Sequence, residues 1–287
     1  MNMSQDKPRT VETTVVIEAS VEDVWKALTE AADLVRWFPL EAQVTPGVGG
    51  SFRLSWRGNW EWNMRTVVWE PGRHVRFVQE QTPPYDVEGK PLSGDKAPPV
   101  ELTLDFFLTG EGGGTRLRVV HSGFGQGAAW DHELEGVGRG WNLELAGLRH
   151  YLRRHKGKDR LMAWARASTK LDLQQAWSRV TGPEGLAREG RLEGLREGER
   201  YRIRSAQDDV FEGRVVQCNP PWDFSGTVSR LDDSLLRVAA DRFTGRTSLN
   251  IWLSYWGPEP SQVEAMERRW QGMLDALLGP APTPQAV

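Results

Sequence analysis

Hydrophobic and polar residues alternate along two segments in the first half of the chain, residues 51–57 and 101–109. Every second side chain is apolar in each, so an extended chain has one apolar face, the pattern of a half-buried strand. Residues 10–19 are rich in β-branched side chains and also predict a strand. Between Trp141 and Leu152 the apolar residues recur at helical spacing. This pattern predicts strands followed by a long helix with one buried face.

A short helix is predicted after the first strand. Ser20 precedes apolar residues at helical spacing in residues 21–28, and Asp23 stands at the capping-box position. Apolar residues between 34 and 38 predict a second short helix, which Pro39 ends.

Further strands are predicted at residues 60–70, 73–80 and 115–122, although the pattern of 60–70 does not fix which side chains are buried. Residues 82–99 are rich in proline and glycine and predict a loop. Three consecutive glycines at 112–114 predict a hairpin turn. No helix follows them, so they do not form a phosphate-binding loop.

The second half of the chain repeats this order of elements. Residues 24–29 match residues 176–181, and residues 115–125 match residues 247–257. The spacing between matched segments shrinks along the chain, so the second copy has shorter loops and lacks the insertion at 82–99. The last helix aligns in the same way: Trp141 with Trp270, Leu145 with Leu274, and Leu148 with Leu277.

Two tandem domains explain this repeat. We expect the first at residues 10–155 and the second at residues 160–279, each an α+β helix-grip fold in which a curved antiparallel sheet wraps around a long C-terminal helix. A chain of 287 residues is long for one hydrophobic core and sufficient for two.

Residues 11–154 resemble the START-like superfamily, also called SRPBCC, and within it the family related to the activator of heat-shock protein 90 ATPase. The second half departs from the motif where Glu189 replaces Trp37 and Leu253 replaces His121. The matching stretches are IEASVEDVW at 17–25, DLVRWF at 33–38, the Glu70-Pro71 turn, GTRLRVVHSGF at 114–124 and the pair Gly140-Trp141.

The resemblance implies a seven-stranded antiparallel sheet that grips the C-terminal helix, with a cavity between them. Members of the superfamily bind lipids, sterols, polyketides and plant hormones. Some are aromatases or cyclases, and the namesake of the family is a co-chaperone. The fold alone does not choose among these functions.

Tryptophan is unusually frequent, with 14 in the chain. Because its side chain is large and apolar with one N–H donor, this composition indicates either a densely filled core or a cavity with aromatic walls. We expect a cavity in the first domain and a smaller, more filled interior in the second. The candidate ligand-binding residues are Trp25, Trp37, Phe52, Trp56, Phe77, Phe106, His121, Phe124, Trp141 and Leu145.

His121 is the polar residue of greatest interest, because its position in the strand places it on the inward face with Leu117 and Val119. A neutral imidazole there can hydrogen-bond a ligand or move a proton, or it can be satisfied by a local partner. Leu117 and Val119 cannot orient a catalytic base, and we expect Glu101 and Asp105 to point outward. We therefore predict that no residue is catalytic.

Other polar groups give no metal or cofactor site. His150 and His155 are off one helical face, and the one cysteine, Cys218, has no partner for a metal-binding pair. Asp131, His132 and Glu133 are adjacent and point apart, so we expect them at the polar start of the last helix. We predict no metal and no cofactor.

The net charge of -3 gives no reason to expect a nucleic-acid partner, and no segment is apolar enough to predict a membrane span. The single cysteine and polar N-terminus predict a cytoplasmic protein. We expect a hydrophobic or aromatic small molecule as the partner, bound in the first domain without catalysis. Two alternatives stay open: a cyclase or hydrolase that uses His121, and a module that binds a chaperone or another protein, with Trp252 on its exposed patch.

Overall fold

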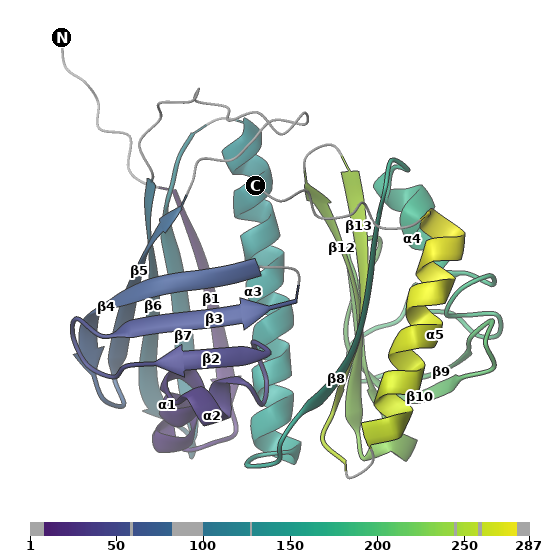
Figure 1. The fold of residues 1–287 in the computed structure, drawn as a ribbon. Coiled ribbons are helices and arrows are strands. Elements are labelled where there is room, and N and C mark those ends of the chain that lie inside the picture. Colours follow the sequence, from purple (N-terminus) through teal and green to yellow (C-terminus); the bar gives the residue numbers. More distant parts are fainter. Residues whose placement is uncertain are drawn as a thin grey trace. The chain divides into compact units, whose positions relative to one another are not determined.

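The computed structural model describes residues 9–57, 60–81, 100–126, 128–243, 246–257 and 260–279. The chain separates into two compact units, Met1–Gly157 and Lys158–Val287 (Figure 1). The segment 82–99, predicted as a loop, lies outside the described residues.

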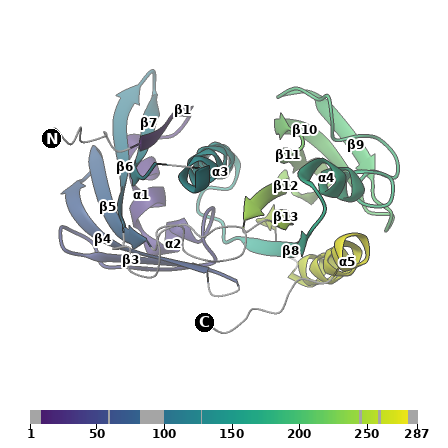
Figure 2. The same cartoon turned by 90° about the horizontal axis from the view of Figure 1, so that it is seen from above.

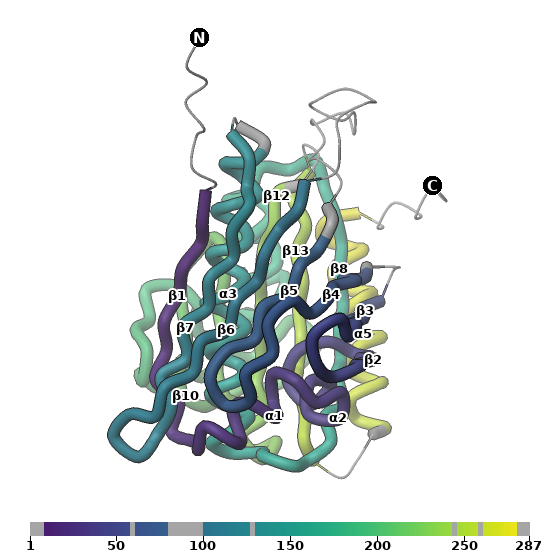
Figure 3. Tube along the Cα trace, turned by 90° about the vertical axis from the view of Figure 1, so that its left-hand side faces the viewer, coloured from purple at the N-terminus to yellow at the C-terminus, as the bar shows by residue number. Residues whose placement is uncertain are grey.

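The first unit contains a sheet of seven antiparallel strands in the described part of the chain. Their order is β1-β7-β6-β5-β4-β3-β2, and β1, β7, β6 and β5 can be followed side by side in Figure 3. The strands are β1 (Arg9–Ile17), β2 (Glu41–Val44), β3 (Ser51–Trp56), β4 (Trp60–Glu70), β5 (His74–Gln81), β6 (Val100–Glu111) and β7 (Gly114–Phe124).

Three helices complete the first unit: α1 (Val21–Thr29), α2 (Ala31–Leu34) and α3 (Ala128–Arg154). The Ser20 hydroxyl caps α1 by accepting a hydrogen bond from the Asp23 N–H at 3.1 Å, as the capping pattern predicts. Helix α2 ends at Leu34, so the helix expected from the apolar residues between 34 and 38 is wrong for Trp37 and Phe38, which follow α2 in a turn. Helix α3 lies in the curve of the sheet, where Figure 2 shows it nearly end-on.

The second unit has six described strands in the equivalent order, β8-β13-β12-β11-β10-β9. Among its described residues no strand corresponds to β2; an isolated bridge joins Glu189 to Arg204 of β9 instead. The elements are β8 (Leu161–Thr169), α4 (Leu173–Thr181), β9 (Arg200–Arg204), β10 (Val210–Asn219), β11 (Asp223–Val228), the 3₁₀ helix η1 (Ser229–Leu231), β12 (Ser234–Phe243), β13 (Arg246–Tyr255) and α5 (Pro260–Leu278).

The repeat extends to individual hydrogen bonds. In the first unit the Thr115 hydroxyl donates to the Ala19 carbonyl at 2.8 Å, and in the second the Thr247 hydroxyl donates to the Leu171 carbonyl at 2.9 Å. Both bonds join the strand before the last helix to the residue two positions after the first strand of the unit. The predicted tandem α+β helix-grip fold is therefore confirmed. Two further pairs repeat: Thr29 to the Trp25 carbonyl with Thr181 to the Trp177 carbonyl, and Asp23 N–H to Ser20 with Gln175 N–H to Asp172.

Among the described residues, no helix is both long enough and apolar enough to cross a membrane.

Candidate functional site

An apolar cavity lies in the first unit, between the inner face of the sheet and α3. Its volume is about 20 Å³, which is room for roughly one water molecule. None of its lining side chains is titratable. They are Leu28, Leu34, Trp37, Phe38, Phe52, Leu54, Trp62, Met64, Phe77, Leu104, Phe106 and Trp141.

Five of the ten candidate residues line this cavity together. Phe52, Phe77 and Phe106 point inward from β3, β5 and β6, while Trp141 reaches it from α3. Trp37 lies in the turn after α2, where its indole N–H donates to the Ala27 carbonyl at 2.8 Å. All five are buried.

The other five candidates do not line it. Trp25 packs on the Trp69 ring, with the centroids 5.2 Å apart, and Trp56 contacts the neighbouring rings from outside the lining. The remaining three are buried without facing the cavity: His121, Phe124 and Leu145.

The expected void, bounded by Trp37, Trp56 and Trp141 and large enough for an organic molecule, is not found among the described residues. Trp56 is absent from the lining, and the volume is far smaller than a ligand needs. Phe38 and Trp62, which are not among the ten candidate residues, also line this space.

The sequence pattern does not identify Trp62 as a candidate, because it does not fix which side chains of residues 60–70 are buried. In the structure Trp62 pairs with Leu54 of β3, which places both on the inner face together with Met64. The alternation with the polar residues Asn63 and Arg65 was a usable signal for this. The sheet register shifts between Thr66 and Val68, which is why the alternation does not continue along the whole strand.

Aromatic rings connect the cavity with the surface. Phe38 stacks on Trp37 at 5.0 Å and meets Trp56 at 5.2 Å and Trp62 at 5.7 Å, while Trp62 and Trp141 are 6.2 Å apart. Trp37 and Trp141 are buried, whereas Phe38, Trp56 and Trp62 are half-buried. We call these five residues the aromatic wall.

His121 lies next to Trp141, and 5% of the His121 surface is exposed. The Trp141 indole N–H donates to its Nδ1 at 3.3 Å, and the Phe124 ring lies 4.9 Å away. An indole nitrogen only donates, so Nδ1 is the acceptor and the proton of the neutral imidazole belongs on Nε2. Burial lowers the pKa of His121 to about 4. The imidazole is therefore neutral at pH 7 and holds Trp141 in place.

Asp105 has the outward orientation expected for its strand position, since Leu104 pairs with His121 and Asp105 faces the other side of the sheet. The Asp105 carboxylate is nevertheless buried beside His74 and Arg76. Its Oδ1 accepts a hydrogen bond from Arg76 Nε at 2.7 Å and lies 2.6 Å from His74 Nε2. Within the described part of the chain, no carboxylate hydrogen-bonds His121, and no cluster of three or more His, Cys, Asp or Glu residues could hold a metal ion.

The second copy lacks this histidine–tryptophan pair. Trp270, the counterpart of Trp141, is fully buried, but the position of His121 is occupied by Leu253. The Trp270 indole N–H has no hydrogen-bond partner among the described residues. The two domains therefore differ at the polar centre of their cores.

This difference predicts unequal effects of the same substitution. Trp141→Phe leaves the His121 Nδ1 buried without a donor, whereas Trp270→Phe removes a donor that already lacks an acceptor. Both changes lose the same ring volume, so the first should lower the free energy of unfolding of its own unit by about 1–3 kcal/mol more than the second. Urea denaturation followed by NMR signals of each unit measures both; equal losses would contradict the assignment of the His121 bond.

The comparison with protein families gives a match in the first unit. Residues 18–153 match the family model described as Activator of Hsp90 ATPase homolog 1-like protein. None of the curated proteins matches the chain. A crystal structure of a protein from Mesorhizobium loti is 24% identical, with a TM-score of 0.43, and covers 51% of this chain and 98% of its own.

Two solved structures span both units. The di-domain ARO/CYC BexL from the BE-7585A biosynthetic pathway is 14% identical with a TM-score of 0.42, covering 96% of this chain and 100% of its own. DynU16, from the dynemicin biosynthetic locus, is 18% identical with a TM-score of 0.42, covering 93% and 96%. The resemblance found in the sequence is confirmed for the first domain, which matches the Activator of Hsp90 ATPase homolog 1-like family over residues 18–153.

Proposed function

We propose that the first domain binds a hydrophobic or aromatic small molecule between its sheet and α3, without catalysing a reaction. The observation that carries this proposal is the aromatic wall, whose contacting rings run from buried Trp141 to half-buried Phe38, Trp56 and Trp62. Ligand pockets are mostly apolar and aromatic with few polar groups, and the lining of this cavity has that character.

Binding requires the cavity to enlarge, because about 20 Å³ does not hold an organic molecule. The rings of Phe38, Trp56 and Trp62 are half-buried and border solvent on one side, whereas Trp37 and Trp141 are buried. Outward rotation of the half-buried rings would enlarge the cavity. An aromatic ligand would replace the ring contacts that are lost. It thereby stabilises an open conformation that is rare in its absence.

The absence of catalysis is part of the proposal. The described lining contains no acid, base or nucleophile, and the Nδ1 of His121 already accepts from Trp141. With its pKa lowered to about 4, His121 is a weak base at pH 7. These features support binding over the cyclase or hydrolase alternative. The cytoplasmic location stays a prediction from the sequence.

Titration with the neutral aromatic probe N-phenyl-1-naphthylamine, followed by its fluorescence, tests the proposal. Trp62→Ala removes one ring of the wall and should weaken binding about three- to tenfold, because an aromatic contact contributes about 0.5–1.5 kcal/mol beyond its buried area. Trp252→Ala, a change on the outer face of the second sheet, is the matched control and should bind like the unchanged protein. Equal affinities of the two variants would contradict the assigned site.

The small cavity volume also favours the alternative of a protein-interaction module, which needs no internal void. That alternative predicts an exposed apolar patch, with Trp252 as its candidate. Trp252 instead stacks on Trp164 at 6.2 Å with the Arg237 guanidinium 5.4 Å from its ring. The large hydrophobic side chains exposed in the described part of the chain are Val16 and Val48, in different elements. Ligand binding is therefore better supported.

A further inference from the structure

A surface groove of about 540 Å³ lies in the second unit. Its walls come from the start of α5, from η1 and from the residue before β10. The apolar side chains in it are Leu231, Ala265 and Met266, and the charged ones are Asp209, Arg230 and Arg269. An apolar surface with a few charged groups is the composition of a site for an amphipathic small molecule.

The charges of the groove do not cancel. Arg269 Nη2 lies 2.8 Å from Asp209 Oδ1, so these two groups neutralise each other. Arg230 is exposed and forms no ion pair with any of the described residues. The groove therefore presents one uncompensated positive charge beside an apolar surface, and its electrostatic complement is a monoanion.

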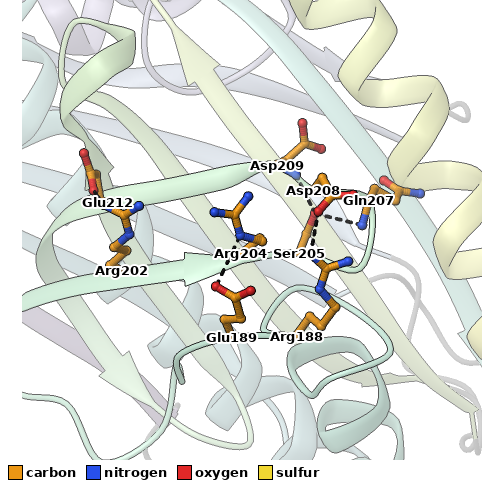
Figure 4. A network of polar contacts seen from close by, with 9 residues as sticks. All are labelled: Arg188, Glu189, Arg202, Arg204, Ser205, Gln207, Asp208, Asp209 and Glu212. Carbon is orange, nitrogen blue, oxygen red and sulfur yellow. Dashed lines mark hydrogen bonds and ion pairs between the residues drawn. The ribbon is translucent and has the colours of Figure 1, made fainter.

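The polar side of the groove is fixed by local hydrogen bonds. The Ser205 hydroxyl accepts from the N–H groups of Gln207 and Asp209, at 3.2 and 3.1 Å, and Gln207 Nε2 donates to the Arg269 carbonyl at 2.8 Å. In Figure 4 the Asp209 carboxylate points away from the Arg202–Glu212 and Arg204–Glu189 pairs. The turn and α5 are thus joined before any ligand arrives, which reduces the entropy lost on binding.

We propose that this groove binds a small carboxylate with a compact apolar body. The carboxylate pairs with the Arg230 guanidinium, which matches it with two parallel N–H donors. The apolar body covers Met266, Ala265 and Leu231. The site belongs to the second unit and does not depend on the function proposed for the first.

Phenylacetate is a suitable probe, titrated into the full chain and followed by ligand-observed NMR. Arg230→Gln should weaken its binding tenfold or more, since a hydrogen-bonded charge pair is lost from an exposed position where glutamine does not disturb folding. Arg202→Gln is the control, because Arg202 pairs with Glu212 on β10 and does not line the groove. It should leave the affinity unchanged.

Two further ligands separate the parts of the proposal. Phenylacetamide keeps the ring but lacks the charge, and acetate keeps the charge but lacks the ring; each should bind at least tenfold more weakly than phenylacetate. Phenylacetate binding that is unchanged by Arg230→Gln, or phenylacetamide binding of equal strength, would overturn the proposal. So would loss of phenylacetate binding in Trp62→Ala, which would place the ligand in the first domain.

Discussion

Replacing Trp141 with alanine should lower the free energy of unfolding of the first unit by about 3–5 kcal/mol and create an apolar cavity that binds indole. The Trp141 ring is buried against Phe38 at 5.9 Å, Phe106 at 5.6 Å and Trp62 at 6.2 Å. Its removal joins the space of the ring to the cavity already present. The substitution also leaves the Nδ1 of His121 without its donor.

Thermal denaturation of Trp141→Ala with and without indole measures both effects. Indole should raise the midpoint of this variant, because a ligand that binds only the folded state stabilises it in proportion to the logarithm of its concentration. Trp252→Ala is the control and should show neither the large loss nor the response to indole. A Trp141→Ala protein that is destabilised yet unaffected by indole would show that the core collapses, and would count against a ligand site at this position.

Acidification should destabilise the first unit before the ordinary carboxylates titrate. The pKa of His121 is about 4 in the folded protein and 6.5 in an unfolded chain. Between these values the unfolded state binds a proton that the folded state does not. The free energy of unfolding therefore falls as the pH drops through this window, by up to about 3 kcal/mol at its lower end.

His121→Gln separates this effect from other titrations. The glutamine side-chain oxygen can accept the Trp141 indole N–H but does not titrate. Urea denaturation of both proteins between pH 7 and pH 4 should therefore show a weaker pH dependence for the variant, by about one proton. Identical pH profiles would mean that His121 is not held neutral by burial.

The elements of the first domain that follow simple alternation were predictable. Residues 51–57 and 101–109 correspond to β3 and β6, with Phe52, Leu54 and Leu104 facing inward. In a strand with one buried face every second side chain points to that face, so the alternation alone predicts this arrangement. The repeat was also predictable from the sequence, because matched residues have the same structural role in both units. Thr115 and Thr247, for example, make the same hydrogen bond.

What the sequence did not reveal depends on contacts between distant strands. Trp62 faces inward because it pairs with Leu54 of β3. Asp105 is buried because the side chains of His74 and Arg76, on the neighbouring strand β5, pack against it. The cavity volume depends on how the rings of several elements interlock, which no local pattern encodes. The groove at Arg230 is likewise formed by segments that only the fold brings together.

The indole N–H signals of the full chain in a ¹H–¹⁵N NMR spectrum test the central proposal most directly. On addition of N-phenyl-1-naphthylamine, the signals of Trp37, Trp62 and Trp141 should shift together, because these rings line one site. The signals of Trp177 and Trp270, in the core of the second unit, should stay in place. Signals assigned by single Trp→Phe variants make the result unambiguous. Shifts confined to Trp177 and Trp270, or no shift of Trp141 at a saturating probe concentration, would contradict a ligand site in the first domain.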